Sequence, residues 1–555
     1  MIRRIISCFF ILSVAGVHLA SGQNFTEILG RPTVNSITMS ILFDTPVEVY
    51  WEYGNSPGNY PMSTGTFNAG KDHPLEADLP GLTPDLKYYY RSRYRANGNG
   101  GSFLTGPEHS FHTPRPPGHS FTFAIEADPH LDSNSNPDAY SLTLQNIATE
   151  NPDFLIDLGD NFFSEKQPGV NQAIITARHV LYRSYFGSVC HSAALFLVIG
   201  NHEGESGWIL DGTTGSLPVM ASNTRNLYYP NPVPNSFYSG DNKPEQFVGL
   251  RGNYYAWEWG DALIVVLDPY WYTLVKPDWG WTLGVDQFNW FKNTLTASHA
   301  KYKFVFCHNL VGGSGNDARG GAEFAHLFEW GGNNTDGSYG FDINRPGWGK
   351  PIHQLMVENH VSIFFHGHDH FYGKQEKDGV IYQEVPQPSN KSITNMSAAE
   401  YGYVNGLFLP GRGYLKVTVT PDSTNIKYIK SYLTAEENAN HKNGEVADSY
   451  SVKSYFASSD QGNEIPSSLR LDQNFPNPFH LLTTISYTLP AACQVQVELL
   501  NIDGRQVAIL ADKCQQSGNH KLLIDSLKLS LVPGIYYCRL TTGKYTQTIK
   551  MICIA

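Results

Sequence analysis

The chain has 555 residues, of which 41% are hydrophobic and 16% charged, with a formal net charge of −12. This composition excludes a mainly disordered protein, and the length predicts three or more folded units. An acidic chain without a clustered Lys/Arg face is not typical of nucleic-acid binding, so we predict no nucleic-acid partner. A small phosphorylated substrate is not excluded, because bound metal cations would dominate the local charge of such a site.

The first residues have the organisation of a secretory signal peptide. Met1-Ile2-Arg3-Arg4 precedes an apolar run from Ile5 to Ala20, and Ala20-Ser21-Gly22 supplies small residues suited to cleavage. A membrane anchor is the alternative, but the run is short for a span and the chain turns polar from Gln23. We therefore predict a signal peptide at residues 1–22. No later stretch is long and apolar enough to predict a transmembrane segment in the mature chain.

The chain has seven cysteines, and Cys8 belongs to the predicted signal peptide. Cys190 and Cys307 lie beside apolar strand-like runs and are predicted to be small core residues. Export permits disulfides, but six cysteines in a long chain with a sufficient core do not indicate a disulfide scaffold. The late cysteines could still pair, with the connectivity left open: Cys493, Cys514, Cys538 and Cys553.

Residues 23–115 show short β-type runs between turn residues, as in Thr38–Phe43 and Val47–Trp51, without a convincing amphipathic helix. Leu79-Pro80-Gly81-Leu82-Thr83-Pro84, followed by Tyr88-Tyr89-Tyr90-Arg91, resembles the turn and next strand of fibronectin type III-like modules. Similar β-sandwiches precede the catalytic domain of plant-type purple acid phosphatases. A fold alone does not give a function. We therefore assign this domain no activity of its own and expect it to space and shield the catalytic domain.

A stiff junction, Pro114-Arg115-Pro116-Pro117-Gly118, separates this module from a second domain at residues 119–433. Apolar runs there alternate with longer segments that could be helical, and their continuous apolarity is typical of strands buried on both faces. An α/β layered domain is therefore expected. The predicted strands are Phe121–Ala127, Phe154–Leu158, Leu195–Ile199, Ala262–Leu267, Lys303–Cys307 and Val361–Phe365.

The polar, poorly periodic segment 434–468 is predicted to be a linker, and residues 469–555 return to β character as a small separate β-sandwich. That tail resembles the C-terminal sorting domain of the type IX (Por) secretion system. The resemblance implies passage to the periplasm, export through the outer membrane by the type IX machinery, and a secreted or cell-surface protein. The matching motifs are Leu471-Asp472-Gln473-Asn474-Phe475-Pro476-Asn477-Pro478-Phe479, Thr484–Pro490, Gly504-Arg505-Gln506-Val507 and Pro533-Gly534-Ile535-Tyr536. A carbohydrate-binding β-module is the alternative.

Five short motifs rich in His, Asp and Asn follow predicted strands of the central domain. Ligands of an open α/β sheet bind outside the carboxyl ends of its strands, so these segments should converge although they lie far apart in sequence. Carboxylate, imidazole and amide oxygen are ligands of hard or borderline divalent metals. The motifs are Asp128-Pro129-His130, Gly159-Asp160-Asn161, Gly200-Asn201-His202-Glu203, His308 and Gly367-His368-Asp369-His370.

The order of these motifs resembles the calcineurin-like metallophosphoesterase superfamily across roughly residues 120–433. The resemblance implies a layered α/β/β/α sandwich, flanked here by the two small all-β sandwich domains, and two metal ions whose identity (Mn, Fe or Zn) is open. It implies that Asp160 bridges the metals and that His202, which is not a ligand in the family, is the general acid. The implied first-metal ligands are Asp128, His130, Asp160 and His370, and the second-metal ligands are Asp160, Asn201, His308 and His368.

The motifs depart from purple acid phosphatases at two positions. Those enzymes place a tyrosinate ligand three residues after the bridging aspartate, where this chain has Phe163, and typically lack the ligand that His130 would supply. We therefore expect no purple chromophore and no obligatory ferric site. Their two extra histidines after the fourth motif are also missing between Gly312 and Arg319.

Other candidates have weaker support. We expect His366 to support the ligands rather than to be one. Glu203 or Asp157 is a candidate for orienting His202. Arg319 and Arg412 could contact substrate oxygens, although surface positions are commoner for arginine.

The function that follows is hydrolysis of phosphate esters outside the cell, as a monoesterase or a diesterase, by in-line attack of a water activated by two metals. A nucleotidase or nucleic-acid-related phosphodiesterase is the alternative within this chemistry. A surface binding protein that has kept the fold and lost catalysis is the alternative of another class. It is less favoured because all seven ligand positions are retained.

Overall fold

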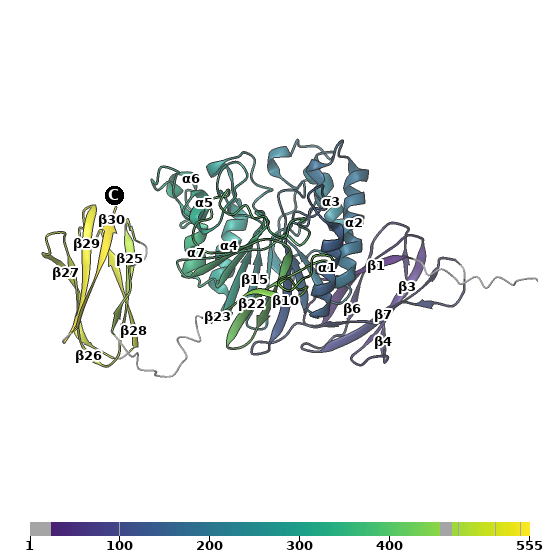
Figure 1. The fold of residues 1–555 in the computed structure, drawn as a ribbon, viewed down its shortest axis with the longest axis horizontal. Coiled ribbons are helices and arrows are strands. Elements are labelled where there is room, and N and C mark those ends of the chain that lie inside the picture. The colour runs from purple at the N-terminus through teal and green to yellow at the C-terminus, as the bar shows by residue number, and fades with distance from the viewer. Residues whose placement is uncertain are drawn as a thin grey trace, which may run out of the picture. The chain divides into compact units, whose positions relative to one another are not determined.

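The computed structural model shown in Figure 1 describes residues 24–98, 100–454, 469–474, 477–516, 518–543 and 545–554. The chain divides into two compact units, Met1–Tyr455 and Phe456–Ala555. The predicted signal peptide, residues 1–22, lies outside the described residues. No helix in the described part of the chain has the length and apolarity needed to cross a membrane.

The N-terminal part of the first unit consists of two antiparallel sheets, which agrees with the predicted all-β module. Side chains along β3 (Val47–Gly54) and β7 (Lys87–Ala96) alternate between buried and partly exposed, as expected for strands with one face on a core. The likeness to fibronectin type III modules remains a prediction. One sheet has the order β1 (Phe25–Gly30), β2 (Ser36–Phe43), β6 (Leu75–Pro80), and the other has the order β4 (Met62–Ser63), β3, β7, β8 (Leu104–Thr105), with β5 (Phe67–Ala69) and β9 (His109–His112) paired to it.

The central domain contains two mixed sheets. In the first, β10, β11 and β12 are parallel neighbours, and β21 adds to β10 in the antiparallel sense. Its order is β12 (Ala194–Leu197), β11 (Phe154–Asp157), β10 (Phe121–Glu126), β21 (Gly413–Val419), β22 (Ser423–Lys430), β23 (Val446–Lys453). In the second, β15, β16, β17 and β19 are parallel. Its order is β13 (Ser239–Gly240), β14 (Tyr255–Trp259), β15 (Ala262–Val266), β16 (Tyr302–Phe306), β17 (Ile363–His366), β19 (Val380–Glu384), β18 (Tyr372–Lys377), β20 (Leu407–Leu409).

Alternate residues of these strands belong to different cores, and this arrangement creates the layers. Phe123 and Ile125 of β10 pack in the core shared by the two sheets, whereas Ala124 between them packs against helices. Figure 1 shows α1 (Pro137–Thr149), α2 (Gln172–Cys190) and α3 (Leu217–Tyr228) on one side of the sheets and α4 (Val285–Ala297), α5 (Phe328–Gly331) and α7 (Ile352–Glu358) on the other. The short α6 (Phe341–Asn344) also contributes Phe341 to the second helical core. The predicted α/β/β/α sandwich is confirmed.

The predicted linker at 434–468 is wrong in its first half. Residues Val446–Lys453 form β23, which pairs with β22 at the edge of the first sheet. Glu436 is also tied to the domain, because both terminal nitrogens of the buried Arg412 donate to its carboxylate. An edge strand that buries little of its side chains needs no apolar residues, so its sequence lacks the alternation that identifies a half-buried strand.

The second unit consists of two antiparallel sheets, as predicted for a small β-sandwich. Its core includes Ile485, Val497, Leu499, Cys538 and Leu540. The orders are β24 (Arg470–Leu471), β25 (Leu482–Leu489), β28 (Gly518–Asp525) and β27 (Gln506–Gln515), β26 (Cys493–Leu500), β29 (Gly534–Thr542), β30 (Tyr545–Cys553).

The four cysteines of this unit are free, so the possibility of pairing is not realised. Cys514 lies opposite Gln494, next in sequence to Cys493, and its thiol contacts the Gln494 amide oxygen at 3.2 Å. Successive side chains of a strand point to opposite faces, so Cys493 and Cys514 lie on different faces of the sheet. Cys190 and Cys307 are free and buried, as predicted.

Candidate metal centre

The five predicted motifs lie just beyond the carboxyl ends of strands, but of two sheets rather than of one open sheet. Asp128, Asp160 and Asn201 follow β10, β11 and β12 of the first sheet. His308 and His368 follow β16 and β17 of the second sheet. Because the two sheets pack face to face, the carboxyl ends of both meet at one edge of the sandwich, and the loops from both converge there.

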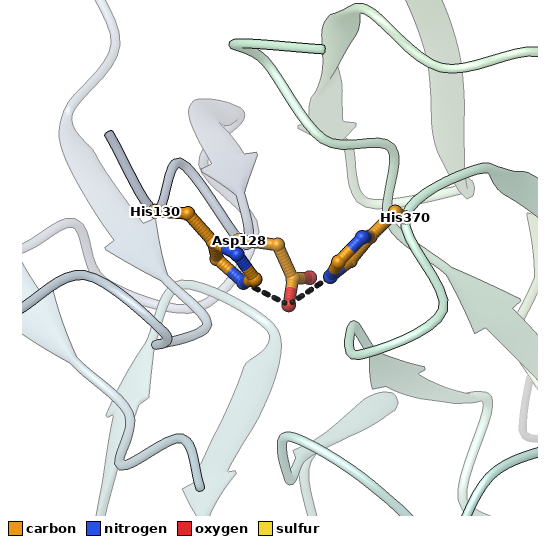
Figure 2. Close-up of side chains that lie close together, drawn as sticks. All are labelled: Asp128, His130 and His370. Atoms are coloured by element: carbon orange, nitrogen blue, oxygen red, sulfur yellow. Dashed lines mark ion pairs between the residues drawn. The ribbon is translucent and has the colours of Figure 1, made fainter. Parts of the chain in front are cut away.

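The first cluster consists of Asp128, His130 and His370. Figure 2 shows the two imidazole rings on opposite sides of the Asp128 carboxylate, with both directed toward it. The Asp128 Oδ1 atom lies 3.6 Å from His130 Nε2 and 3.4 Å from His370 Nε2. Each residue offers one ligand atom, and the three atoms are close enough together to hold one metal ion.

The second cluster consists of Asp160, His308 and His368. The Asp160 Oδ2 atom lies 3.2 Å from His308 Nε2 and also 3.4 Å from His130 Nε2 of the first cluster. One carboxylate oxygen therefore lies between the two clusters, which is the position a bridging ligand would occupy.

Each of the seven predicted ligands except His370 has a buried ligand-type atom without a hydrogen-bond partner in the described structure. Buried polar atoms are nearly always satisfied, so a group of such atoms at one point indicates a partner of another kind. The atoms are Asp128 Oδ1, His130 Nε2, Asp160 Oδ2, Asn201 Oδ1, His308 Nε2 and His368 Nδ1, and each belongs to a predicted ligand.

The remaining oxygens of the two carboxylates are held by backbone amides of the facing motif. The His368 amide donates to Asp128 Oδ2 at 2.8 Å, and the His202 amide donates to Asp160 Oδ1 at 2.7 Å. Each carboxylate is therefore held through one oxygen while the other faces the cluster. The first-motif aspartate depends on the last motif for its orientation, although 240 residues separate them.

Backbone carbonyl groups fix the orientation of two of the imidazole rings. His308 Nδ1 donates to the Leu158 carbonyl at 2.7 Å, and His368 Nε2 donates to the Asp317 carbonyl at 2.8 Å. A carbonyl can only accept, so the opposite nitrogen of each ring carries the lone pair. That nitrogen is Nε2 of His308 and Nδ1 of His368, the two atoms that face the cluster.

The backbone of the centre is strained. Asp128, His130, Asp160, His368 and His370 have φ between 51° and 80°, in the left-handed region that non-glycine residues rarely adopt. Each such residue costs about 1–3 kcal/mol and persists only where the surrounding structure holds it. Gly159, at φ 94°, is required for another reason, because a Cβ there would lie 2.5 Å from the Gly200 amide nitrogen.

The electrostatics favour positive charge between the carboxylates. Burial lowers the pKa of His308, but the charges of Asp160 and Asp128 outweigh it and raise the pKa to about 10. Burial acts in the same way at His130, where both carboxylates raise the pKa to about 9. The imidazoles in turn hold the pKa of Asp128 well below its usual range, against the effect of burial. A cation placed between these groups would replace protons rather than enter a neutral cavity.

His202 lies beside the clusters, with Nε2 3.9 Å from Asp160 Oδ2. Its Nδ1 atom is 2.7 Å from Glu165 Oε1, so Glu165 orients the ring. The expectation that Glu203 or Asp157 does so is wrong. Glu203 accepts the backbone amides of Gly200, Asp160 and Asn161, and Asp157 accepts the Gly159 amide.

Residues 121–372 match the family described as calcineurin-like phosphoesterase, and residues 473–554 match the secretion system C-terminal sorting domain. The chain therefore contains a calcineurin-like phosphoesterase domain and a C-terminal sorting domain. The sorting domain indicates secretion through the type IX system to the cell surface or exterior. No curated protein matches the chain.

Two solved structures share the fold. Purple acid phosphatase PPD1 from yellow lupin (Lupinus luteus) seeds is 15% identical with a TM-score of 0.53, and the match covers 78% of this chain and 74% of that chain. PhoD is 16% identical with a TM-score of 0.56, over 77% of this chain and 90% of that chain. Identities this low show the fold alone.

In this phosphoesterase domain, Phe163 occupies the position at which a purple acid phosphatase has its tyrosinate ligand. Its ring centroid lies 5.0 Å from that of His130 and 4.6 Å from that of His202. Phe163 therefore forms an apolar wall beside the first cluster and offers no ligand atom. The absence of a purple chromophore stays a prediction.

The two arginines with weaker support are not free at the surface. Arg319 donates through Nη1 to the His368 carbonyl at 2.7 Å and to Asp369 Oδ1 at 2.8 Å, beside the second cluster. Arg412 is buried and donates to the carboxylate of Glu436. His366 is buried with Nδ1 2.7 Å from Glu384 Oε2, and Glu384 Oε1 accepts the Asp369 and His370 amides.

A buried ion-pair network fixes the loop that follows the third motif of the phosphoesterase domain. Glu205 bonds Arg225 of α3 and Arg251, and Arg251 also bonds Asp268 beyond β15, at 2.6–2.8 Å. All four side chains are at most 1% exposed. Sequence reasoning missed this network, because Arg225, Arg251 and Asp268 are remote from every motif.

Glu205→Ala is expected to lower the free energy of unfolding by about 3–5 kcal/mol, because two buried guanidinium groups lose their shared counter-ion. Burial raises the pKa of Glu205, but Arg225 and Arg251 lower it from its ordinary value of 4.5 to about 2. Its contribution is thus present above about pH 4.5 and is lost as the pH falls toward 2. Urea unfolding at pH 7, 4 and 3 measures this, and the exposed Glu376→Ala is the control. Equal loss in both variants would contradict the prediction.

Proposed function

We propose that this chain is a secreted dinuclear-metal phosphoesterase that hydrolyses phosphate monoesters or diesters. The observation that carries the proposal is the position of Asp160 Oδ2, within 3.4 Å of a histidine of each cluster and without a hydrogen-bond partner in the described structure. A carboxylate oxygen in that environment suits two cations at once. Around it lie His370 and five further potential metal-ligand atoms that have no hydrogen-bond partner among the described residues.

The residues present fit such a pair of metals. Three carboxylate or amide groups and four imidazoles supply mixed oxygen and nitrogen donors without a thiolate, which suits Mn, Fe or Zn. Asp128, His130 and His370 would hold the first ion and Asn201, His308 and His368 the second, with Asp160 shared. Bound there, the metals would supply an activated water and would neutralise the phosphoryl oxygens.

We assign His202 as the general acid that protonates the leaving oxygen. Its Nδ1 atom is engaged by Glu165, which leaves Nε2 toward the clusters. As the bond from phosphorus to the leaving oxygen breaks, a proton passes from His202 Nε2 to that oxygen, and the attacking water loses its proton to solvent. Glu165 keeps the ring oriented. Proton transfer of this kind contributes about 10²- to 10⁴-fold in rate.

Two alternatives differ in testable ways. A nucleotidase or nucleic-acid-related phosphodiesterase would use the same centre, and the net charge of −12 disfavours long polyanions only. An inactive binding protein on the same fold is disfavoured because the unsatisfied atoms and strained backbone of the centre are retained.

Removal of metal is expected to abolish activity. The purified protein should hydrolyse phenyl phosphate or bis(4-nitrophenyl) phosphate, lose this activity after dialysis against chelator, and regain it with Mn, Fe or Zn. Elemental analysis before and after dialysis reports the metal content. A metal-loaded protein inactive on both esters would favour the binding protein, and activity that survives complete metal removal would exclude the dinuclear mechanism.

A further inference from the structure

Lys276 is held beside the centre by two indole rings. Its ammonium nitrogen lies 4.0 Å from the ring centroid of Trp208 and 5.1 Å from that of Trp281. The two indoles pack edge to face at 5.5 Å, so they form a rigid wall. The ammonium therefore lies against that wall, and the lysine side chain is still 23% exposed.

Two carboxylates near the centre act on Lys276. Its ammonium is 3.9 Å from Asp317 Oδ1, and the carbonyl of that same residue holds the His368 ring. The carboxylate of Glu165, the partner of His202, lies within electrostatic range of the same ammonium. Burial lowers the pKa of the lysine, and the carboxylates of Asp317 and Glu165 oppose this effect. Lys276 thus contacts the loop that orients a predicted ligand and interacts electrostatically with the residue that orients the proposed general acid.

The side chains that remain partly open mark where a substrate enters. His202 is 15% exposed, Glu165 19% and His370 31%, whereas Asp128, Asp160 and His308 are at most 1% exposed. Lys276, at 23%, belongs with the open group. Its contacts in the described structure are with Trp208, Trp281 and Asp317, so it lies outside the predicted ligand set.

The ammonium group of Lys276 has N–H donors that are available to a ligand. Within the described residues it makes no hydrogen bond, because its distance to Asp317 Oδ1 is beyond hydrogen-bond range and that carboxylate is 68% exposed. Its three N–H donors therefore make no hydrogen bond to the described residues. An ammonium on a flexible stem suits phosphate oxygens as a point charge.

We propose that Lys276 is a specificity-determining residue that binds a second phosphate group on the leaving-group side of the substrate. The inference rests on the proposed function, because the side of the leaving group is defined by His202. The reacting phosphoryl group is assigned to the metal clusters, and the cation lies within electrostatic range of Glu165, the partner of the proposed general acid. The favoured substrates are then diphosphates, whose leaving group is itself a phosphate.

The test compares inorganic pyrophosphate with phenyl phosphate, whose leaving group carries no phosphate. Lys276→Met keeps the apolar stem over Trp208 and removes the charge. We expect its kcat/KM to fall about 10- to 100-fold on pyrophosphate, the effect of losing one charge-assisted hydrogen bond, and by less than about threefold on phenyl phosphate. Lys276→Arg should keep most of the pyrophosphate activity.

The matched control is Lys374→Met, since Lys374 of β18 likewise lies over an aromatic ring, that of Tyr450, at 4.1 Å. Equal losses of kcat/KM on both substrates in Lys276→Met would indicate a structural role. Unchanged pyrophosphate hydrolysis would show that Lys276 does not contact the second phosphate group. Either result overturns the inference. A wild-type protein active on phenyl phosphate and inactive on pyrophosphate would also overturn it, while the proposed function would stand. Inactivity on every ester would overturn both.

Discussion

Asp160→Asn is expected to lower kcat/KM on phosphate esters by about a thousandfold or more while the protein stays folded. The substituted amide can still accept the His202 backbone amide through its oxygen, so the loop geometry survives. It then presents an NH₂ group, a donor without a negative charge, between the two clusters. Losing the shared ligand removes several kcal/mol of transition-state stabilisation, and each 1.36 kcal/mol is a factor of ten.

Steady-state kinetics, metal analysis and thermal unfolding of the same preparation test this expectation. His308→Ala should behave similarly, because its Nε2 atom is the nearest imidazole nitrogen to Asp160 Oδ2. The exposed Asp336→Asn is a matched control with the same chemical change. Near-normal turnover in Asp160→Asn, with two metals per chain retained, would refute the bridging assignment.

His202→Ala is expected to lower kcat by about 10²- to 10⁴-fold on esters with poor leaving groups, such as alkyl phosphates. The metal content should not change, since His202 is outside the predicted ligand set. The loss should be much smaller on 4-nitrophenyl phosphate, because nitrophenolate leaves without needing a proton. This dependence on the leaving group separates a general acid from a residue that only binds phosphate.

Glu165→Gln provides the second half of this test. The amide can still accept the Nδ1–H of His202 but carries no charge, so a smaller loss of about tenfold is expected, with the same dependence on the leaving group. The exposed His326→Ala is the control for removing an imidazole from a loop of this domain. A loss in His202→Ala that is equal for all leaving groups would contradict the general-acid role.

The strand ends and the motifs that follow them could be predicted from the sequence because both are local signals, and the resemblance to a known family implied which of those residues are ligands. Predicted strands such as Phe154–Leu158 and Val361–Phe365 are apolar because both faces of the sandwich bury them, and the structure has strands within a few residues of each. Ligand-type residues follow at once, and parallel strands bring such residues to a common edge. The tail motifs likewise identified the sorting domain from adjacent residues.

The partners of those residues could not be derived, because they depend on how separate loops pack. Glu165 is 37 residues from His202, and nothing in either motif distinguishes it from Glu203, which is adjacent. The strand β23 escaped prediction because an edge strand with little burial needs no apolar pattern. Lys276 carries no motif at all, and its place beside Trp208 follows from the path of the loop after β15.

By itself, then, the sequence determined the domain types, the strand ends and the set of candidate ligands, since burial and strand polarity are encoded residue by residue. Only the tertiary structure decided that two sheets rather than one bring the motifs together, and that Asp160 Oδ2 is the atom between the clusters. It also decided which side chains orient His202 and border the entrance. These relations are set by long-range packing and by hydrogen bonds between remote loops, such as that from His368 to Asp128, and such contacts leave no local pattern in a single chain.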